Sequence, residues 1–150
     1  MAKLYFRYGA VGSGKTHVML SVAHTYEQQG KRVFVMKPSI DTRFGTQVVQ
    51  SRSGWTRDAD FIIENKGVEP SELLLFLANV QCILVDEAQF LNTKTIDTLR
   101  ILTLTLDIPV ICYGLRTNFK SHLFEGSQRL MELADTIEEI KETKQINKES

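Results

Sequence analysis

The amino-acid sequence predicts an α/β domain in which a central, mostly parallel sheet lies between two layers of helices. Short apolar runs of the strand type alternate with longer segments of helical periodicity, which is the order that a parallel sheet requires. The 150 residues fit one compact domain, and 43% of them are hydrophobic and 24% charged, as in ordinary globular proteins. These proportions exclude a disordered chain, a collagen-like repeat and a coiled-coil rod.

The first half of the chain supplies two predicted strands, one helix and a long loop. The apolar-aromatic run from Leu4 to Tyr8 is typical of a strand and ends at Gly9. A helix that ends near Gly30 follows, because apolar residues recur on one helical face at positions 18, 19, 22, 23 and 26. Positions 33–36 form a second strand of the buried type. The polar segment 39–58 has weak periodicity, which predicts a long mobile loop with a short strand near residue 48.

The second half continues the alternation of helices and strands up to residue 140. The predicted elements are a helix over 70–78, a strand over 82–85, a helix over 93–106, a strand over 110–113, a helix over 127–134 and a strand over 136–140. We therefore expect one domain over residues 1–140. Residues 141–150 are polar and offer no core positions, so we expect a loose C-terminal tail there.

Charge and cysteine content exclude several functional classes. Eighteen basic residues balance eighteen acidic residues, whereas a nucleic-acid-binding protein carries an excess of positive charge. Cys82 and Cys112 lie in apolar runs and are expected as buried thiols rather than as parts of a disulfide or a zinc site. The longest apolar stretch is too short to span a bilayer, and the N-terminus lacks a secretion signal. We expect a cytoplasmic protein that contacts neither membranes nor nucleic acid.

A glycine-rich segment between the first strand and the first helix carries the clearest functional signal. It matches the phosphate-loop pattern G-x-x-x-x-G-K-[ST] in full, with Gly9, Ala10, Val11, Gly12, Ser13, Gly14, Lys15 and Thr16. Glycines let the backbone wrap around phosphate oxygens, and the start of the following helix favours negative charge. Lys15 is expected to contact the β- and γ-phosphates of ATP, and Thr16 to bind Mg²⁺. Together with the alternating elements, this motif predicts a three-layer P-loop NTPase fold.

Two adjacent carboxylates, Asp86 and Glu87, follow the strand that ends at Val85. Asp86 fits the acid that holds Mg²⁺, and Glu87 is placed to accept a proton from an attacking hydroxyl or water. Gln89 is expected to orient the nucleophile or to sense the γ-phosphate of ATP. A water nucleophile gives an ATPase and a substrate hydroxyl gives a kinase. The pattern D-E-x-Q also occurs in helicases, which normally need two such lobes, so these motifs leave the acceptor open.

Further motifs resemble the type II thymidine kinase family. They are LYFRYGA at 4–10, DTRFG at 41–45, VDEAQFL at 85–91, CYGLRT at 112–117 and LFEGS at 123–127. The resemblance runs in order from Leu4 to about Lys141. It implies transfer of a phosphoryl group from ATP, with Mg²⁺, to the 5′-hydroxyl of a deoxynucleoside, with thymidine as the favoured acceptor. It also implies a homo-oligomer, either a tetramer or a dimer.

The resemblance implies roles for individual side chains. Glu87 would be the general base on the 5′-hydroxyl, in agreement with its position in the acidic pair. Arg43 would neutralise charge on the transferring phosphoryl group, and Asp41 would position that arginine or its loop. Leu115, Phe119 and Phe124 match positions that line or support the nucleoside pocket in the family.

The sequence also departs from the family. The family continues into a small zinc-binding domain with two cysteine pairs and a lasso-like loop over the nucleobase, whereas this sequence contains no C-x-x-C pair, so we expect no zinc site. Val11 and Gly12 replace a methionine and a larger residue of the family's phosphate loop. Without the closing domain, the alternatives to a nucleoside kinase are a P-loop ATPase and a catalytically degenerate ATP-binding protein.

Overall fold

The computed structural model describes residues 1–40, 47–118 and 120–141. Its strands are β1 (Leu4–Tyr8), β2 (Arg32–Pro38), β3 (Val48–Gln50), β4 (Thr56–Asp58), β5 (Phe61–Ile63), β6 (Val80–Val85), β7 (Val110–Gly114) and β8 (Thr136–Glu139). Its helices are α1 (Lys15–Gln28), α2 (Pro70–Leu74), α3 (Thr93–Leu106) and α4 (Glu125–Leu133), with a short 3-10 turn, η1, at Ala88–Phe90.

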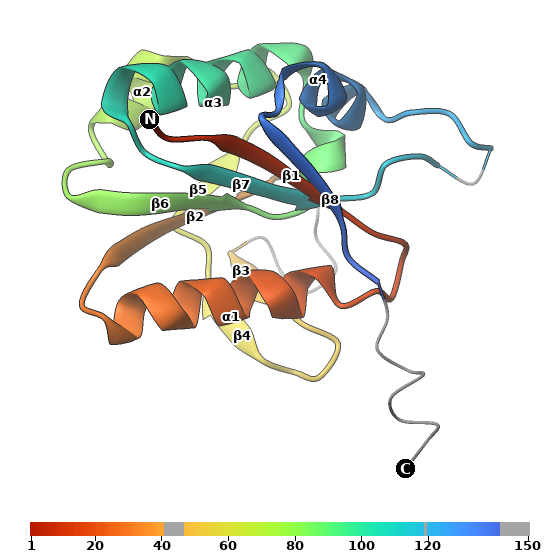
Figure 1. Ribbon diagram of the computed structural model, residues 1–150, viewed down its shortest axis with the longest axis horizontal. Coiled ribbons are helices and arrows are strands. Elements are labelled where there is room, and N and C mark those ends of the chain that lie inside the picture. Colours follow the sequence, from red (N-terminus) through yellow and green to blue (C-terminus); the bar gives the residue numbers. More distant parts are fainter. Residues whose placement is uncertain (41–46, 119, 142–150) are drawn as a thin grey trace.

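The main sheet has six strands in the order β5-β2-β6-β7-β1-β8, and every neighbouring pair runs parallel. Helix α1 covers one face of the sheet, and α2, α3 and α4 cover the other (Figure 1). Helices on both faces are what right-handed crossovers between parallel strands produce. The predicted three-layer α/β fold is therefore confirmed.

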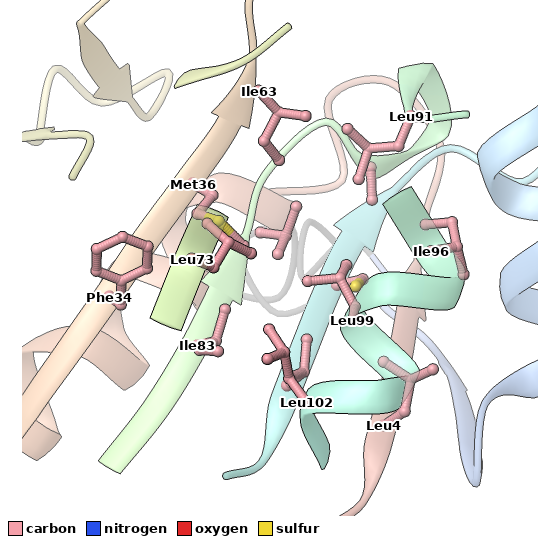
Figure 2. Close-up of a cluster of buried hydrophobic side chains, with 14 of the residues drawn as sticks. Leu4, Phe34, Met36, Ile63, Leu73, Ile83, Leu91, Ile96, Leu99 and Leu102 are labelled. Carbon is pink, nitrogen blue, oxygen red and sulfur yellow. The ribbon is translucent and has the colours of Figure 1, made fainter. Parts of the chain in front are cut away.

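Two apolar layers hold the helices to the sheet, because successive side chains of a strand point to opposite faces. On β2, Phe34 and Met36 belong to the layer beneath α2 and α3, whereas Val33 and Val35 belong to the layer beneath α1. Figure 2 shows the larger of the two layers, in which α3 contributes the fully buried Leu99. Each such side chain stabilises the fold by about 1.5–3 kcal/mol relative to leaving it exposed.

The β3–β4 hairpin lies against α1, on the face opposite to α3 (Figure 1). The indole of Trp55 meets the rings of His17 and His24 edge to face, with centroid distances of 5.4 and 6.1 Å. Arg57 Nη2 pairs with Glu27 Oε2 at 3.0 Å near the other end of the helix. These contacts fix the hairpin along the length of α1.

The hairpin is the main departure from the sequence expectation. The sequence predicts a loop over 39–58 with one strand near residue 48, and β3 confirms that strand. The loop interpretation is wrong for residues 48–58, because β4 pairs with β3 in antiparallel register. The strand β4 is polar on both faces, so periodicity does not reveal the pairing. The hairpin docks through contacts of Trp55 with the neighbouring helix α1. The three-residue strand β5 is also missed, since so short a run gives no pattern.

The remaining boundaries follow the sequence closely, with one exception. The helix predicted over 70–78 ends at Leu74, and Asn79 adopts a left-handed φ of 63° just before β6 begins. The other predicted strands, and the helices over 93–106 and 127–134, occur within two residues of their expected bounds. Residues 142–150 lie outside the described part of the chain, so the expected tail stays a prediction.

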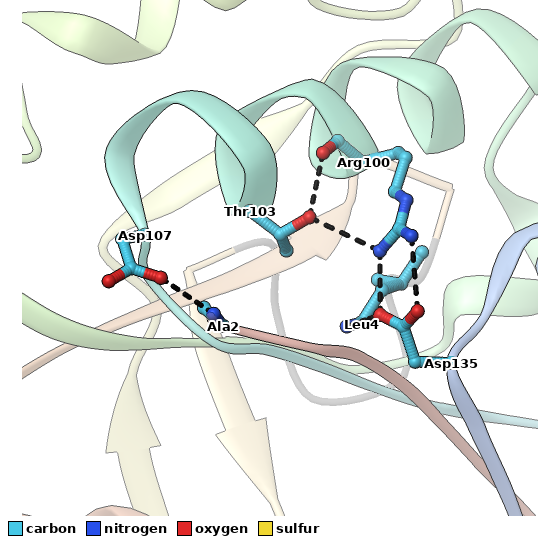
Figure 3. A network of polar contacts seen from close by, with 6 residues as sticks. All are labelled: Ala2, Leu4, Arg100, Thr103, Asp107 and Asp135. Carbon is cyan, nitrogen blue, oxygen red and sulfur yellow. Dashed lines mark hydrogen bonds and ion pairs between the residues drawn. The ribbon is translucent and has the colours of Figure 1, made fainter.

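A polar network joins α3 to the first residue of β1 and to Asp135, which directly precedes β8 (Figure 3). The Arg100 guanidinium donates two hydrogen bonds to Asp135, at 2.6 and 3.1 Å, and the backbone N–H of Leu4 donates to Asp135 Oδ2 at 2.9 Å. The hydrogen bonds from Arg100 and, to a smaller extent, the bond from the Leu4 N–H hold the pKa of the Asp135 carboxyl below its usual value. The network secures the two strands at the end of the sheet opposite to the phosphate loop.

Both cysteines are buried free thiols, as the sequence predicts. Burial raises the pKa of the Cys82 thiol to about 11, so it stays protonated at neutral pH. Within the described ranges, the structure has no helix with the length and apolar character needed to cross a membrane.

Candidate active site

The candidate site lies at the edge of the sheet where β1, β6 and β7 end. The phosphate loop follows β1, the two carboxylates follow β6, and Leu115 follows β7. Because β7 lies between β1 and β6, the three segments are neighbours in space although they are far apart in the sequence. Ligands of open parallel sheets bind at this carboxyl edge.

The phosphate loop leads into α1, and two of its glycines adopt a left-handed backbone conformation. Gly12 and Gly14 have φ angles of 82° and 87°, which L side chains rarely adopt. A β-carbon at Gly14 would meet no atom within 4 Å, so the space beside it is open. The hydroxyl of Ser13 is buried and has no hydrogen-bond partner among the described residues. An open loop with an unsatisfied hydroxyl at a helix start fits a polyanion such as a triphosphate.

Lys15 brings a positive charge to this loop. Its Nζ donates a hydrogen bond to the carbonyl oxygen of Ala10 at 2.9 Å, so the ammonium group reaches back over the loop. Val11, at the outer side of the loop, is 79% exposed. Lys15 thus places its ammonium group at the phosphate loop, as the sequence predicts.

Thr16 and Asp86 meet at the start of α1. The Thr16 hydroxyl donates to Asp86 Oδ2 at 3.1 Å, and Asp86 is only 4% exposed. The backbone N–H of Asp86 donates to Met36 on β2 at 2.9 Å, which fixes the residue to the centre of the sheet. A hydroxyl and a carboxylate are hard oxygen ligands of the kind that Mg²⁺ prefers, so the pair fits that ion.

Glu87 is held next to this pair in an uncommon backbone conformation. Its φ and ψ are 52° and 41°, in the left-handed region. Its Oε2 accepts a hydrogen bond from Gln89 Nε2 at 2.6 Å. Gln89 Oε1 in turn accepts from the backbone N–H of Leu115 at 3.2 Å. Gln89 therefore links Glu87, which follows β6, to Leu115, which follows β7.

Two glycines make room for the η1 turn that carries Gln89. A β-carbon at Gly126 would come within 3.0 Å of the carbonyl oxygens of Ala88 and Leu91. A β-carbon at Gly114 would come equally close to the Gln89 side chain. Because backbone atoms cannot move aside cheaply, any side chain at Gly126 would push the turn out of place.

An aromatic pair lies on the side of the site formed by α4. Phe124 is half-buried at the start of α4, and its ring meets that of Phe90 edge to face, with centroids 5.8 Å apart. Phe90 is 44% exposed, although it follows the acidic pair by only three positions. Phe90 is not among the residues predicted from the sequence, although an aromatic residue soon after an acidic pair of this kind is a usable signal. Leu115 is half-buried at the end of β7.

Arg52 is a second residue that the sequence analysis misses. It lies in the turn of the β3–β4 hairpin, and a β-carbon at Gly12 would come within 3.0 Å of its Nη1. Its side chain makes no hydrogen bond or ion pair with the other residues that the structure describes. No local pattern marks Arg52, because the approach depends on how the hairpin packs against α1.

Three sequence-predicted residues, Asp41, Arg43 and Phe119, lie outside the described residues. Across residues 1–40, 47–118 and 120–141, no group of three or more His, Cys, Asp or Glu side chains is arranged to hold a metal ion.

Comparison with known proteins gives one family and one fold. The family model described as "Thymidine kinase" matches residues 2–148. A thymidine kinase of Streptococcus gordonii is 45% identical over 145 residues, which cover 94% of this chain and 73% of the relative. A thymidine kinase of Lactococcus lactis subsp. lactis is 47% identical over 141 residues, which cover 94% of this chain and 74% of the relative.

A similar solved structure is that of the Pif1 helicase from Candida albicans, with a TM-score of 0.50. The match covers 94% of this chain and 36% of the helicase chain, at 12% sequence identity. At that identity the likeness concerns the fold alone.

Proposed function

The chain belongs to the thymidine kinase family, and we propose on that basis that it transfers the γ-phosphoryl group of ATP to the 5′-hydroxyl of thymidine. Its general activity is that of a thymidine kinase-like nucleoside kinase. The observation that carries the proposal is the position of Glu87, a half-buried carboxylate directly beside the Thr16–Asp86 pair. A base at that point is suited to activate a hydroxyl next to the phosphates of ATP.

The phosphate loop binds the triphosphate in this proposal. Its backbone N–H groups and the start of α1 surround the phosphate oxygens, and Lys15 neutralises part of their charge. Thr16 and Asp86 would hold Mg²⁺, which withdraws charge from the phosphate oxygens when it is bound. Arg52 lies close enough to Gly12 to add a second positive charge.

Glu87 removes the proton from the 5′-hydroxyl. The hydroxyl oxygen then forms a bond to the γ-phosphorus, the bond between that phosphorus and the β–γ bridging oxygen breaks, and ADP leaves with the electron pair. Arg43 is proposed to neutralise charge on the transferring group, and Asp41 to position that arginine or its loop. Leu115, Phe119 and Phe124 are proposed to line or support the nucleoside pocket, together with Phe90.

We further propose that the protein works as a homo-oligomer in the cytoplasm and acts on small molecules rather than on nucleic acid. The balance of eighteen basic and eighteen acidic residues supports the last point, because it leaves no overall attraction for a polyanion.

The experiment that tests the function is a measurement of ADP release with each deoxynucleoside in turn. Stimulation by thymidine, with formation of thymidine monophosphate, supports the proposal. Release that no nucleoside stimulates identifies an ATPase, and tight ATP binding without turnover identifies a catalytically degenerate protein. The variant Lys15→Ala, prepared in the same way, controls for contaminating kinases.

A further inference from the structure

We propose that Gln89 is a positioning residue, which fixes the Glu87 carboxylate for proton transfer and couples it to the backbone of Leu115. The inference rests on the proposed role of Glu87 as the base. It assigns to Gln89 a supporting role, in place of the direct contact with nucleophile or phosphate that the sequence suggests.

The side-chain amide of Gln89 is engaged at both ends. Nε2–H donates to Glu87 Oε2 at 2.6 Å, and Oε1 accepts from the Leu115 N–H at 3.2 Å. The residue is 2% exposed, so these bonds are made away from bulk water. An amide presents one donor end and one acceptor end, and here the two ends face the two different groups. That arrangement favours a supporting role over a phosphate contact.

The backbone of Leu115, to which Gln89 is hydrogen-bonded, is itself held in place by α4. The carbonyl oxygen of Leu115 accepts a hydrogen bond from the hydroxyl of Ser127 on α4, a side chain with no exposed surface. Gly114 and Gly126 pack closely against the η1 turn from β7 and α4. The Leu115 backbone is thus secured through both its N–H and its C=O, and Gln89 transmits that fixed position to Glu87.

Glu87 has a particular need for such support. A glutamate side chain has three rotatable bonds, and its backbone here is in the left-handed region, which costs a non-glycine residue about 1–2 kcal/mol. A short, charge-assisted hydrogen bond restricts the carboxylate to one orientation. Since proton transfer depends on the alignment of the reacting groups, a carboxylate that lost this hydrogen bond would be a poorer base.

The decisive experiment is a double-mutant cycle between Gln89→Met and Glu87→Gln, with single-turnover kinetics where the rate is low. Gln89→Met keeps the length of the side chain and removes both hydrogen bonds. We expect kcat to fall by about 10- to 100-fold, with the KM and Kd for ATP unchanged. In the Glu87→Gln background the same change should cause no further loss, because the carboxylate that it positions is already gone.

A charge swap gives a readout that does not depend on activity. Gln89→Glu places two carboxylates in contact and should lower the melting temperature. The double variant Glu87→Gln, Gln89→Glu restores a donor opposite an acceptor and should recover the melting temperature while kcat stays low. If Gln89→Met does not fold, this swap still tests the contact between the two side chains, and a failure to recover the melting temperature would refute the inference.

A matched control separates positioning from general destabilisation. Thr98→Val removes a buried hydrogen bond to the Val68 carbonyl at 2.7 Å, on the part of α3 away from the site. It should lower the melting temperature without changing kcat. The inference is wrong if Gln89→Met lowers kcat equally in both backgrounds, leaves it unchanged, or weakens ATP binding. If Glu87→Gln alone leaves kcat at the wild-type value, the proposed mechanism fails instead.

Discussion

The hydroxyl of Thr16 and the carboxylate of Asp86 are 70 positions apart in the sequence and 3.1 Å apart in space. One residue begins α1 and the other ends β6, so their contact ties the phosphate loop to the acidic edge of the sheet. Any movement of the loop relative to the carboxylates must break this bond.

Asp86→Asn should therefore weaken the binding of Mg²⁺ together with ATP. The amide keeps the shape and one oxygen but loses the negative charge that attracts a divalent cation. We expect the Mg²⁺ concentration for half-maximal activity to rise, while the affinity for ATP without Mg²⁺ rises or stays the same. Titration calorimetry with and without the metal measures both quantities. An unchanged Mg²⁺ requirement would contradict the assignment.

Lys15→Ala should abolish ATP binding or reduce it severely. The ammonium group reaches over the phosphate loop, and charge-assisted hydrogen bonds of this kind contribute about 1.5–3 kcal/mol each. The loss corresponds to at least a 10-fold weaker Kd. Lys31→Ala, beyond the other end of α1, serves as the control and should bind ATP like the wild type. Equal affinities in the two variants would refute the phosphate-loop assignment.

Glu87→Gln should separate catalysis from binding. The amide keeps the shape of the side chain and removes the base, so we expect near-native ATP affinity with phosphoryl transfer slower by about 10² to 10⁴. Rapid-quench kinetics gives the transfer rate, and calorimetry gives the affinity. A kinase activity that survives this change at full rate would show that another group accepts the proton.

Arg52→Ala should weaken the binding of ATP more than that of adenosine. The Arg52 guanidinium lies next to Gly12, so its contribution is to phosphate charge and not to the base or sugar. We expect about a 10-fold higher Kd for ATP, from one charge-assisted contact at an exposed position. Ser53→Ala, the adjacent position of the turn, is the control. Identical losses for ATP and adenosine would point to displacement of the hairpin instead.

Asp135→Asn should destabilise the fold in a pH-dependent way. Because Arg100 and the Leu4 N–H lower the pKa of the folded carboxyl, its contribution is complete above the unfolded value of about 3.9 and is lost as the pH falls through the lower folded value. At pH 7 we expect a loss of about 1 kcal/mol in unfolding free energy, since the site is partly solvated. Denaturant titrations at pH 7 and pH 3 measure it. A difference from wild type that does not shrink at pH 3 would contradict this explanation.

The sequence predicts those elements of the fold that are marked by a local motif or by an apolar run of regular period. The run from Leu4 to Tyr8, the phosphate-loop glycines and the acidic pair after Val85 each combine a local signal with a position along the alternation. Their meeting at one edge follows from parallel strand direction alone. The position of the two carboxylates beside the phosphate loop could therefore be predicted from the sequence, while their roles stay predictions.

What the sequence does not predict depends on packing between distant segments. Arg52 reaches Gly12 only because the hairpin docks on α1, and the link from Gln89 to Leu115 crosses from η1 to the end of β7. Phe90 is exposed only because the η1 turn directs it away from the core. Neither residue spacing nor hydropathy reports such contacts, since each joins residues whose separation follows no period.

The position of Trp55 gives the protein a built-in optical reporter. The sequence contains a single tryptophan, and the structure places it in the hairpin, against His17 and His24 on α1. The indole therefore contacts the residue that directly follows Thr16, the proposed metal ligand. Its fluorescence therefore comes from one environment, in which the indole lies against two imidazole rings. Nucleotide binding that moved the hairpin relative to α1 would thus change the fluorescence of the unlabelled protein.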